Sequence, residues 1–338
     1  MTKNRIGKET LVFRDPPSII GFSAVGGKKE GAGPLGSLFD MISEDNTFGE
    51  KTWEKSESRM QRESSVRALN RAGLPENGVD ITIAGDLLNQ CIGSSFASRD
   101  TMVPLLGVYG ACSTMAQSLG LGAVILGGGF ASKLLCMTSS HFCSAERQYR
   151  FPLEYGSQRP SSAQWTATAS GSVVLADTGV GPFIRACIFG HIEDLGIKDV
   201  NNMGAAMAPA AAATLAQFFN DTGSKPDDYD LIATGDLSRV GTDVLYELMD
   251  NEGFDIRAKH NDCGLILYDD TQEVDSGGSG CGCSASVLCA KLIPDMIAGK
   301  LKKLLFAGTG ALLSPTSAMQ GESIPGICHL VYIDTERG

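Results

Sequence analysis

The feature that most constrains the fold is an order of strands and helices that occurs twice along the 338 residues. In each half, a strand, a helix and a second strand precede a glycine-containing turn with a cysteine, a long apolar helix and two closing strands. Strands that alternate with helices are typical of βα units with mainly parallel pairing. A repeat of about 150 residues therefore predicts an α/β protein of two similar halves, residues 1–180 and 181–338.

The expected elements follow the apolar periodicity of the chain. Helices are expected where apolar residues recur at helical spacing, at residues 52–72, 115–130, 203–219, 237–249 and 284–298. Strands are expected in short apolar or β-branched runs, at residues 10–13, 19–25, 79–84, 108–112, 131–138, 167–176, 183–189, 230–233, 303–307 and 326–333. Residues 28–37 and 139–160 are expected to be loops.

Cys112 is the most distinctive residue, because it opens the apolar helix at residues 115–130. Ser113 or Thr114 can cap the first turn of that helix. Unpaired backbone N–H groups and the positive end of the helix dipole at such a position favour an anion or a thiolate. The alternative is a plain core cysteine, since free cysteine is among the most buried residue types.

The charge balance excludes one class of partner. The chain carries 28 Lys and Arg against 39 Asp and Glu, a formal net charge of −11. Nucleic-acid binding requires a basic footprint, so no nucleic-acid partner is expected. The same charge argues against simple electrostatic attachment to anionic lipid.

Neither a secretory signal nor a membrane span is expected. Residues 1–14 are polar and charged, unlike a signal peptide, and no uninterrupted apolar window of about 18 residues occurs. The ten cysteines are therefore expected as reduced thiols. Cys281 and Cys283 flank Gly282, but no Cys or His pair stands at zinc-binding spacing, so no metal site is expected.

Three stretches of the chain, together with the repeated order of strands and helices, resemble the thiolase fold family. Thiolases and ketoacyl synthases place their acyl-accepting cysteine at the start of such a helix, and Cys112 matches that position. The matching stretches are AGDLLNQCIGSSFASRD and YGACSTMAQSLGLGAVILGGGFAS in the first half and GLILYDDTQEVDSGGSGCGCSAS in the second. The resemblance implies a thiolase-like, five-layered αβαβα arrangement and a homodimer formed through the edges of the central sheets.

The same resemblance implies that the catalytic groups have been replaced. Alignment of LIATGDLSRVG with the family's His-x-x-Asn motif puts Gly235 in place of the histidine and Ser238 in place of the asparagine. The asparagine of the family's Gly-Asn-Thr-Ser turn falls on Cys281. Loss of one acid–base partner typically costs about 10²–10⁴-fold in rate. A non-enzymatic protein is therefore expected; the alternative is an acyltransferase or condensing enzyme, dependent on acyl-CoA or acyl-carrier protein, that uses Cys112 with an unusual base such as His141.

Within this family the chain is similar to a sporulation group, through the stretches MTSSHFCSAERQYRFPLEYGSQRP, ATGDLSRVG and DSGGSGCGCSAS. That similarity implies binding of dipicolinic acid (pyridine-2,6-dicarboxylate) or its calcium chelate during uptake into the developing spore, with a link to germination. It also implies a peripheral location at the forespore and spore inner membrane, integral membrane partners from the same operon, and no cofactor besides calcium in the ligand. A structural adaptor with a vestigial pocket is a third alternative.

A flat aromatic dianion needs donors for two carboxylates and a slot for its ring. Backbone N–H groups behind Cys112 and in the turn at residues 277–283 are expected to supply donors. Arg147, or else Arg150 or Arg159, is expected to compensate the charge, and His141 to donate. The expected ligand-binding residues are Asp86, Cys112, His141, Arg147, Cys281, Gly282 and Cys283.

Several of these residues also have a purely structural interpretation. Asp86 would repel a free dianion but suits one that arrives with Ca²⁺, which prefers oxygen ligands; it can equally cap a turn. His141 can be a hydrogen-bonded structural residue. The arginines can form a solvated loop face.

Overall fold

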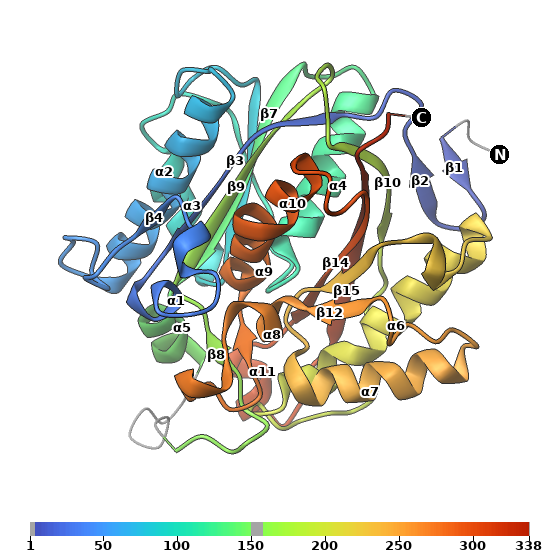
Figure 1. Cartoon of the computed structure of the whole chain (residues 1–338). Coiled ribbons are helices and arrows are strands. Elements are labelled where there is room, and N and C mark those ends of the chain that lie inside the picture. Colours follow the sequence, from blue (N-terminus) through green and yellow to red (C-terminus); the bar gives the residue numbers. More distant parts are fainter. Residues whose placement is uncertain (1–3, 150–157, 338) are drawn as a thin grey trace.

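The computed structural model of the chain describes residues 4–149 and 158–337, and its main sheet runs through both halves (Figure 1). In the first half the strands lie in the order β3 (Ser18–Gly26), β9 (Ala169–Ala176), β7 (Lys133–Ser140), β5 (Ile81–Asp86), β6 (Leu105–Gly107). In the second half the order is β10 (Phe183–Phe189), β15 (Gly326–Asp334), β14 (Lys303–Ala311), β11 (Leu231–Thr234), β12 (His260–Asp262).

The two halves of the main sheet, joined where β10 pairs with β3, have the same strand topology and are called the two central sheets below. In each, the first strand along the chain lies beside the last, followed in space by the fourth, the second and the third. β5 pairs in parallel with β6 and β7, as β11 does with β12 and β14, whereas β9 and β15 run antiparallel to their neighbours. The predicted duplicated α/β fold is therefore confirmed. The boundary at residue 180 stays a prediction; it falls between β9 and β10.

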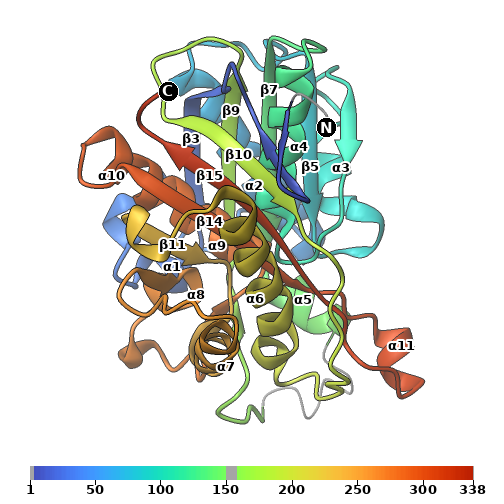
Figure 2. The ribbon, with the colours of Figure 1, turned by 90° about the vertical axis from the view of Figure 1, so that its right-hand side faces the viewer.

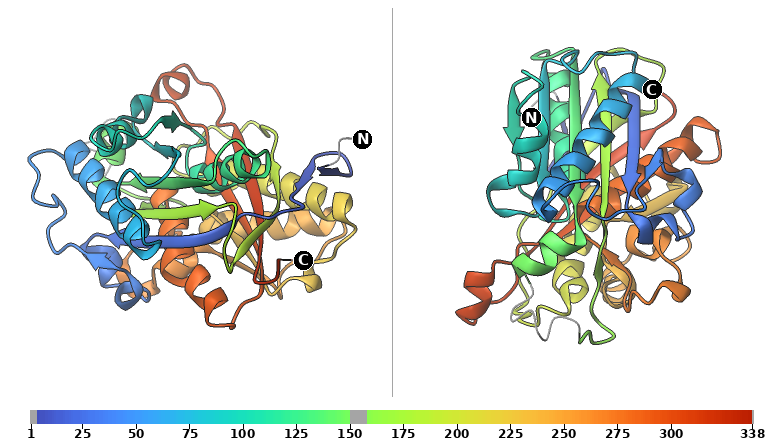
Figure 3. Two further views of the ribbon diagram at one scale, coloured as in Figure 1. Left: turned by 90° about the horizontal axis from the view of Figure 1, so that it is seen from above. Right: turned by 90° about the vertical axis from the view of Figure 1, so that its left-hand side faces the viewer.

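Helices complete the five layers. α2 (Trp53–Arg71) and α3 (Ile92–Ser98) cover the outer face of the first half, where Figure 3 shows α2 across the strands. α6 (Met203–Thr222) and α7 (Ser238–Asn251) cover the outer face of the second half (Figure 2). Between the sheets lie α4 (Thr114–Gly127) and α9 (Cys281–Val287), the latter continuing through a π-helical turn at Leu288–Leu292 into α10 (Ile293–Ile297).

The apolar core follows these layers. The largest cluster lies between the two sheets and contains Met115 and Leu119 from α4 together with Val287 from α9. Burial of each such side chain contributes roughly 1.5–3 kcal/mol. Separate clusters lie under the outer helices and include Leu69 of α2 and Phe218 of α6.

Shorter elements complete the described chain. They are β1 (Arg5–Ile6), β2 (Thr10–Val12), α1 (Lys28–Gly31), β4 (Met41–Ile42), α5 (Phe142–Tyr149), α8 (Cys263–Leu267), α11 (Pro315–Met319) and the parallel pair β8 (Trp165–Thr166) and β13 (Gly278–Ser279). Among the described helices, none has the length and apolar composition needed to cross a membrane. The ten cysteines are all unpaired thiols.

Asp221, near the end of α6, attaches the N-terminal hairpin to the body of the protein. Its carboxylate accepts hydrogen bonds from the backbone N–H groups of Lys8 at 2.7 Å, Glu9 at 2.8 Å and Thr10 at 2.8 Å, and from the Thr10 hydroxyl at 2.9 Å. These bonds lower the pKa of Asp221 to about 2 against the opposing effect of desolvation by burial. The hairpin is therefore held both by this carboxylate and by the antiparallel pairing of β2 with β10.

Three local predictions need correction. The expected loop at residues 28–37 contains α1, and the expected loop at residues 139–160 opens with α5. The strand expected at residues 108–112 lies earlier, as β6. In each case an element of three to eight residues is too short for its apolar periodicity to identify it.

Candidate functional site

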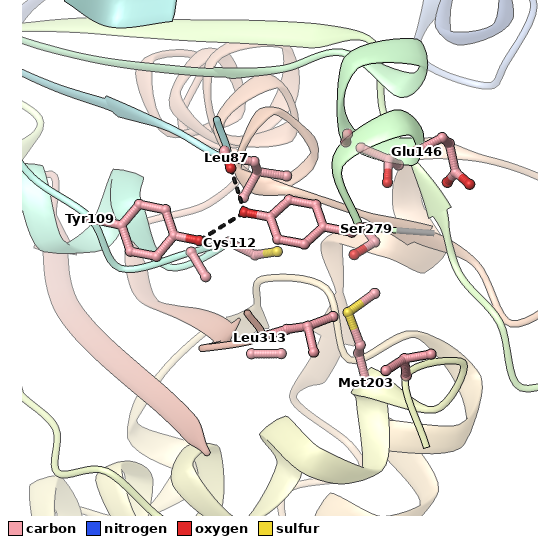
Figure 4. Close-up of a pocket in the computed structure, with 13 residues that line it drawn as sticks. Leu87, Tyr109, Cys112, Glu146, Met203, Ser279 and Leu313 are labelled. Atoms are coloured by element: carbon pink, nitrogen blue, oxygen red, sulfur yellow. Dashed lines mark hydrogen bonds between the residues drawn. The ribbon is translucent and has the colours of Figure 1, made fainter. Parts of the chain in front are cut away.

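A pocket opens where the two halves meet, next to the start of α4 (Figure 4). Its space amounts to about 580 Å³, including the part that is open to solvent. Both halves contribute to the wall, which is made of Leu87, Tyr109, Ala111, Cys112, Ala145, Glu146, Tyr149, Thr166, Val200, Met203, Ser279, Ala311 and Leu313. The wall is thus mainly apolar with a few polar groups, as is usual for small-molecule sites.

A strained turn places Cys112 in this wall. Ala111, directly before it, has a φ of 48°, in the left-handed region that residues other than glycine rarely adopt. The turn packs tightly on β14, because a Cβ atom at Gly310 would lie 2.4 Å from the Gly110 carbonyl oxygen. The position of the cysteine therefore depends on a glycine in the second half, and such strain is concentrated at functional sites.

The expected helix cap at Ser113 or Thr114 is wrong. The Ser113 hydroxyl donates to the Gly110 carbonyl at 2.6 Å, and the Thr114 hydroxyl donates to the Ala111 carbonyl at 2.6 Å. The backbone N–H groups of the same two residues donate to the same two carbonyls, at 3.0 and 3.3 Å. These N–H groups are therefore not available to a ligand.

Asp236 lies beside the Cys112 thiol and helps to raise its pKa. This fully buried carboxylate follows β11 and accepts hydrogen bonds from the hydroxyls of Ser279 and Thr309, at 2.9 and 2.8 Å, and from the Gly280 N–H at 2.9 Å. It also lies close enough to the Cys112 thiol for the two groups to shift each other's pKa. Desolvation and the neighbouring carboxylate raise the pKa of Cys112 well above its usual value. The thiolate expected from the helix dipole is therefore disfavoured.

Cys281 lies in the same buried cluster as Cys112, together with Leu87, Ala111 and Ala145. It is the first residue of α9, and its thiol donates to the Ser139 carbonyl at 2.9 Å. Burial raises its pKa as well. The two cysteines are thus brought together as expected, although Cys281 does not itself line the pocket.

The expected N–H donors around the start of α9 are largely occupied, since the Gly280 N–H donates to Asp236. The Gly282 N–H donates to the Ser140 hydroxyl at 3.1 Å, and the Cys283 N–H donates to the Gly280 carbonyl at 2.9 Å. Cys283 belongs to the core cluster between the two sheets. The structure therefore places both Gly282 and Cys283 outside the pocket wall.

Asp86 has the structural surroundings of a turn cap. It ends β5 and is fully buried, and it accepts hydrogen bonds from the backbone N–H groups of Leu88 at 2.9 Å and Ser94 at 2.7 Å, and from the Ser94 hydroxyl at 2.6 Å. Burial raises its pKa. It is not among the residues of the pocket wall.

His141 also lies away from the pocket. Its Nδ1 accepts the Cys143 N–H at 3.2 Å, so the proton is on Nε2, which donates to the Asn46 carbonyl at 2.8 Å. The ring packs 5.5 Å from that of Trp53, and burial lowers the pKa of the imidazole. None of the four histidines in the chain is in the pocket wall.

Arg147 faces a different hollow of the surface, where it pairs with Glu54. Arg159 pairs at 2.8 Å with Glu146, which does line the pocket, and its guanidinium lies 4.9 Å from the ring centre of Trp165. Arg150 lies outside the described residues. Among the described wall residues Glu146 is the one charged side chain, so no described cation faces the pocket.

Sequence reasoning missed Asp236, Tyr109 and Tyr149. Gly235 takes the place of the family's histidine in the alignment, and Asp236 directly follows it, so the sequence did indicate a polar residue near this position. The hydroxyls of Tyr109 and Tyr149 lie 3.0 Å apart, and the Tyr149 hydroxyl also donates to the Leu87 carbonyl (dashed lines in Figure 4). Burial raises the pKa of Tyr109 to about 12 and that of Tyr149 further, so both phenols are neutral at pH 7.

Comparison with solved structures shows the fold. The E117Q variant of OleA from Xanthomonas campestris matches with a TM-score of 0.60 at 16% identity, over 96% of this chain and 99% of that one. The 3-oxoacyl-[acyl-carrier-protein] synthase III of Aquifex aeolicus VF5 matches with a TM-score of 0.56 at 14% identity, over 94% and 99%. The predicted thiolase-like architecture is therefore confirmed.

Comparison of sequences is more specific. Residues 7–334 match the family model described as Stage V sporulation protein AD (SpoVAD). The stage V sporulation protein AD of Bacillus subtilis (strain 168) is 42% identical over 332 residues, which cover 98% of each chain. The chain therefore belongs to the stage V sporulation protein AD family.

Proposed function

We propose that the chain is a non-enzymatic binding protein for dipicolinic acid, taken up as the calcium chelate, and that it supports dipicolinate uptake into the developing spore and thereby later germination. The observation that carries this proposal is the charge of the pocket wall. Glu146 lines it, Asp236 lies behind Cys112, and no described lysine, arginine or histidine faces it. Glu146 is already paired with Arg159 at 2.8 Å, so no cation among the described wall residues is left to compensate a free dianion, whereas the chelate is electrically neutral.

The shape of the wall supports the same ligand. The apolar side chains of Leu87, Met203 and Leu313 surround the space in Figure 4 and can hold a flat ring. Dipicolinate offers three donor atoms to a calcium ion, which takes about 6–8 ligands, mostly oxygen. Water and oxygen atoms of the wall are left to complete its shell.

The proposal that the chain is not an enzyme is supported by the state of the thiol. Burial and the neighbouring Asp236 raise the pKa of Cys112, and none of the four histidines, all of them described, lines the pocket. One observation favours the alternative acyltransferase: Cys112 lies at the start of α4 in a pocket with apolar walls. Incubation with acyl-CoA followed by intact-protein mass measurement tests this, since an adduct on Cys112 would favour the enzyme.

The binding proposal is tested by calorimetry with calcium dipicolinate. Leu313→Trp fills the pocket and should abolish the heat of binding, whereas Ile297→Trp, at a side chain 60% exposed and away from the pocket, should not. Pyridine-2,5-dicarboxylate, which cannot chelate through both carboxylates, should not bind. Absence of binding by the folded wild type would instead favour an adaptor with a vestigial pocket.

We further propose a homodimer and a peripheral location at the forespore and spore inner membrane, beside integral partners from the same operon. β6 ends the sheet in the first half, and Leu106 on it is 41% exposed. Phe96 and Met102 on the preceding segment are also exposed. Such an unpaired apolar edge is suited to pairing with a second copy. Light scattering of the wild type and of Leu106→Lys tests the dimer.

A further inference from the structure

Glu57 is a buried carboxyl group that the proposed function does not use. It lies in α2, and only 1% of the residue is exposed. Its Oε1 lies 3.1 Å from the Ser139 hydroxyl near the end of β7, and its Oε2 lies 2.7 Å from the Ser144 hydroxyl in α5. This side chain therefore connects an outer helix with a strand of the sheet and with a helix that supplies part of the pocket wall.

The contacts around Glu57 need one hydrogen more than the two serines provide. The Ser144 hydroxyl also lies 3.0 Å from the His141 carbonyl, and a carbonyl can only accept. Together with the contact from Ser139, three oxygen–oxygen contacts thus share two hydroxyl hydrogens. A carboxyl proton completes the set, because Glu57 then donates to Ser144, Ser144 donates to His141, and Ser139 donates to the other oxygen of Glu57.

Asp86 is the neighbouring carboxylate, and its contacts are matched without an added proton. It accepts from the backbone N–H groups of Leu88 and Ser94 and from the Ser94 hydroxyl, so each contact has its own hydrogen. Such donors favour the charged form. Burial and the charge of Asp86 raise the pKa of Glu57 well above its usual value. The negative charge of the pair therefore lies on Asp86 and the proton on Glu57.

The strands and helices packed around Glu57 contribute few other titratable groups. β3, β9 and α3, which also contact α2, contain none. In β5 the one such residue is Asp86. In β7, Lys133 begins the strand at its opposite end, and the Cys136 thiol donates to a carbonyl of α4.

The groups on α9 and α5 are neutral or paired elsewhere. Burial raises the pKa of the Cys281 thiol and lowers that of the His141 imidazole, so both are uncharged at neutral pH. The charged side chains of α5 form surface pairs, Arg147 with Glu54 and Glu146 with Arg159. No described lysine or arginine is among the main influences on Glu57, so its ionisation would bury an uncompensated charge beside Asp86.

We propose that Glu57 holds a proton in the folded protein, that this proton fixes α5 to α2 through Ser144, and that its loss at alkaline pH releases α5. Release reaches the pocket, because α5 supplies Ala145, Glu146 and Tyr149 to its wall. α5 is the element that yields, since it has eight residues of which only Ser144 and Ala145 are buried. The inference goes beyond the proposed function and holds whichever molecule the pocket binds.

Infrared spectroscopy tests where the proton lies. A protonated carboxyl group absorbs apart from a carboxylate, so Glu57→Gln should remove one protonated-carboxyl band at neutral pH. Glu63→Gln in the same helix is the matched control. Against the opposing effect of burial, hydrogen bonds from Arg67 and Arg59 lower the pKa of Glu63 and keep it ionised, so this variant should remove no such band. An unchanged spectrum of folded Glu57→Gln would overturn the proposal.

The pH dependence of urea unfolding measures the same proton independently. An unfolded glutamate ionises above its usual pKa of 4.5, whereas Glu57 in the folded protein stays neutral. The unfolding constant of the wild type relative to Glu57→Gln should therefore rise about tenfold per pH unit, up to the pKa of the folded state. The same ratio for Glu63→Gln should stay flat above the usual pKa, and a flat ratio for Glu57→Gln would contradict the proposal.

Hydrogen exchange at residues 142–149 tests the release of α5. Relative to Glu57→Gln at the same pH, the wild type should lose protection there by up to about tenfold per pH unit once Glu57 ionises, while α6 should not change. Should Glu57→Gln not fold, Ser144→Ala removes the acceptor of the proton and should lower the protection of α5 already at neutral pH. Protection of α5 that is equal in the wild type and the folded variants at every pH would overturn the proposal and leave the proposed function standing.

Discussion

Asp236→Asn should make Cys112 a markedly better nucleophile. The variant removes a buried negative charge next to the thiol, and that charge favours the neutral thiol. A nearby like charge shifts a pKa by about 1–3 units, and a pair of unit charges about 4 Å apart at an effective dielectric of about 20 interacts by about 4 kcal/mol, near the upper end of that range. The pKa of Cys112 should therefore fall by about 1–3 units.

The effect on reactivity is smaller than the effect on ionisation. Each unit gives about tenfold more thiolate at neutral pH, but intrinsic nucleophilicity falls with a Brønsted coefficient of about 0.4–0.5. The net increase in the alkylation rate of Cys112 is therefore about 4- to 40-fold. Iodoacetamide labelling between pH 6 and about 9, read by peptide mass spectrometry, measures this rate.

Two controls distinguish this effect from loosening of the fold. Asp262→Asn alters another fully buried carboxylate, which accepts from Thr234 and Ser238 and is not among the main influences on the pKa of Cys112. It should leave the rate at Cys112 unchanged. Cys136, fully buried in the core, should stay unlabelled throughout. An unchanged rate in folded Asp236→Asn, or an equal increase in Asp262→Asn, would refute the reasoning.

Three further predictions concern stability. Asp221→Asn should lower the free energy of unfolding by about 1–2 kcal/mol at pH 7. Because the pKa of Asp221 in the folded protein is depressed to about 2, urea unfolding should show this difference above about pH 4, and the difference should vanish as the pH falls towards 2. Gly310→Ala should lower the free energy of unfolding by about 1–3 kcal/mol, because the added Cβ forces the Cys112 turn away from β14. In the control Gly107→Ala no atom lies within 4 Å of the added Cβ, so its melting temperature should be close to that of the wild type. Arg159→Lys should lower the free energy of unfolding by about 1 kcal/mol and shift the fluorescence of Trp165, because the guanidinium lies over that ring. Unchanged fluorescence would contradict this packing.

The fold was predictable because its signal is long-range and redundant. Strand and helix runs occur in the same order in both halves, and long apolar segments such as α4 and α6 can form only buried helices. α5 was missed because it has eight residues and only two of them are buried, too few for a visible period. The expected helix caps were wrong because the hydroxyls of Ser113 and Thr114 donate to carbonyls of preceding residues. This bonding depends on the strained turn at Ala111.

The candidate site was predictable only in part. Cys112 follows from its helix, but the orientation of α5 decides which of its residues reach the pocket. Ala145, Glu146 and Tyr149 lie on the pocket side, whereas Arg147 is rotated away by one or two steps of about 100°. No sequence pattern sets that rotation. Asp236 is likewise brought to the thiol by packing between the halves, which a sequence does not display.

The pocket wall has a thermodynamic consequence beyond recognition. Because Tyr109 and Cys112 come from one repeat and Met203 and Leu313 from the other, any occupant makes contacts that exist only while both repeats are folded together. Occupancy by a molecule at about 100 times its dissociation constant adds about 2.7 kcal/mol to folding. That protection should reach amide hydrogens in both central sheets at once, so a small ligand would couple the unfolding of the two halves more tightly than their shared core does alone.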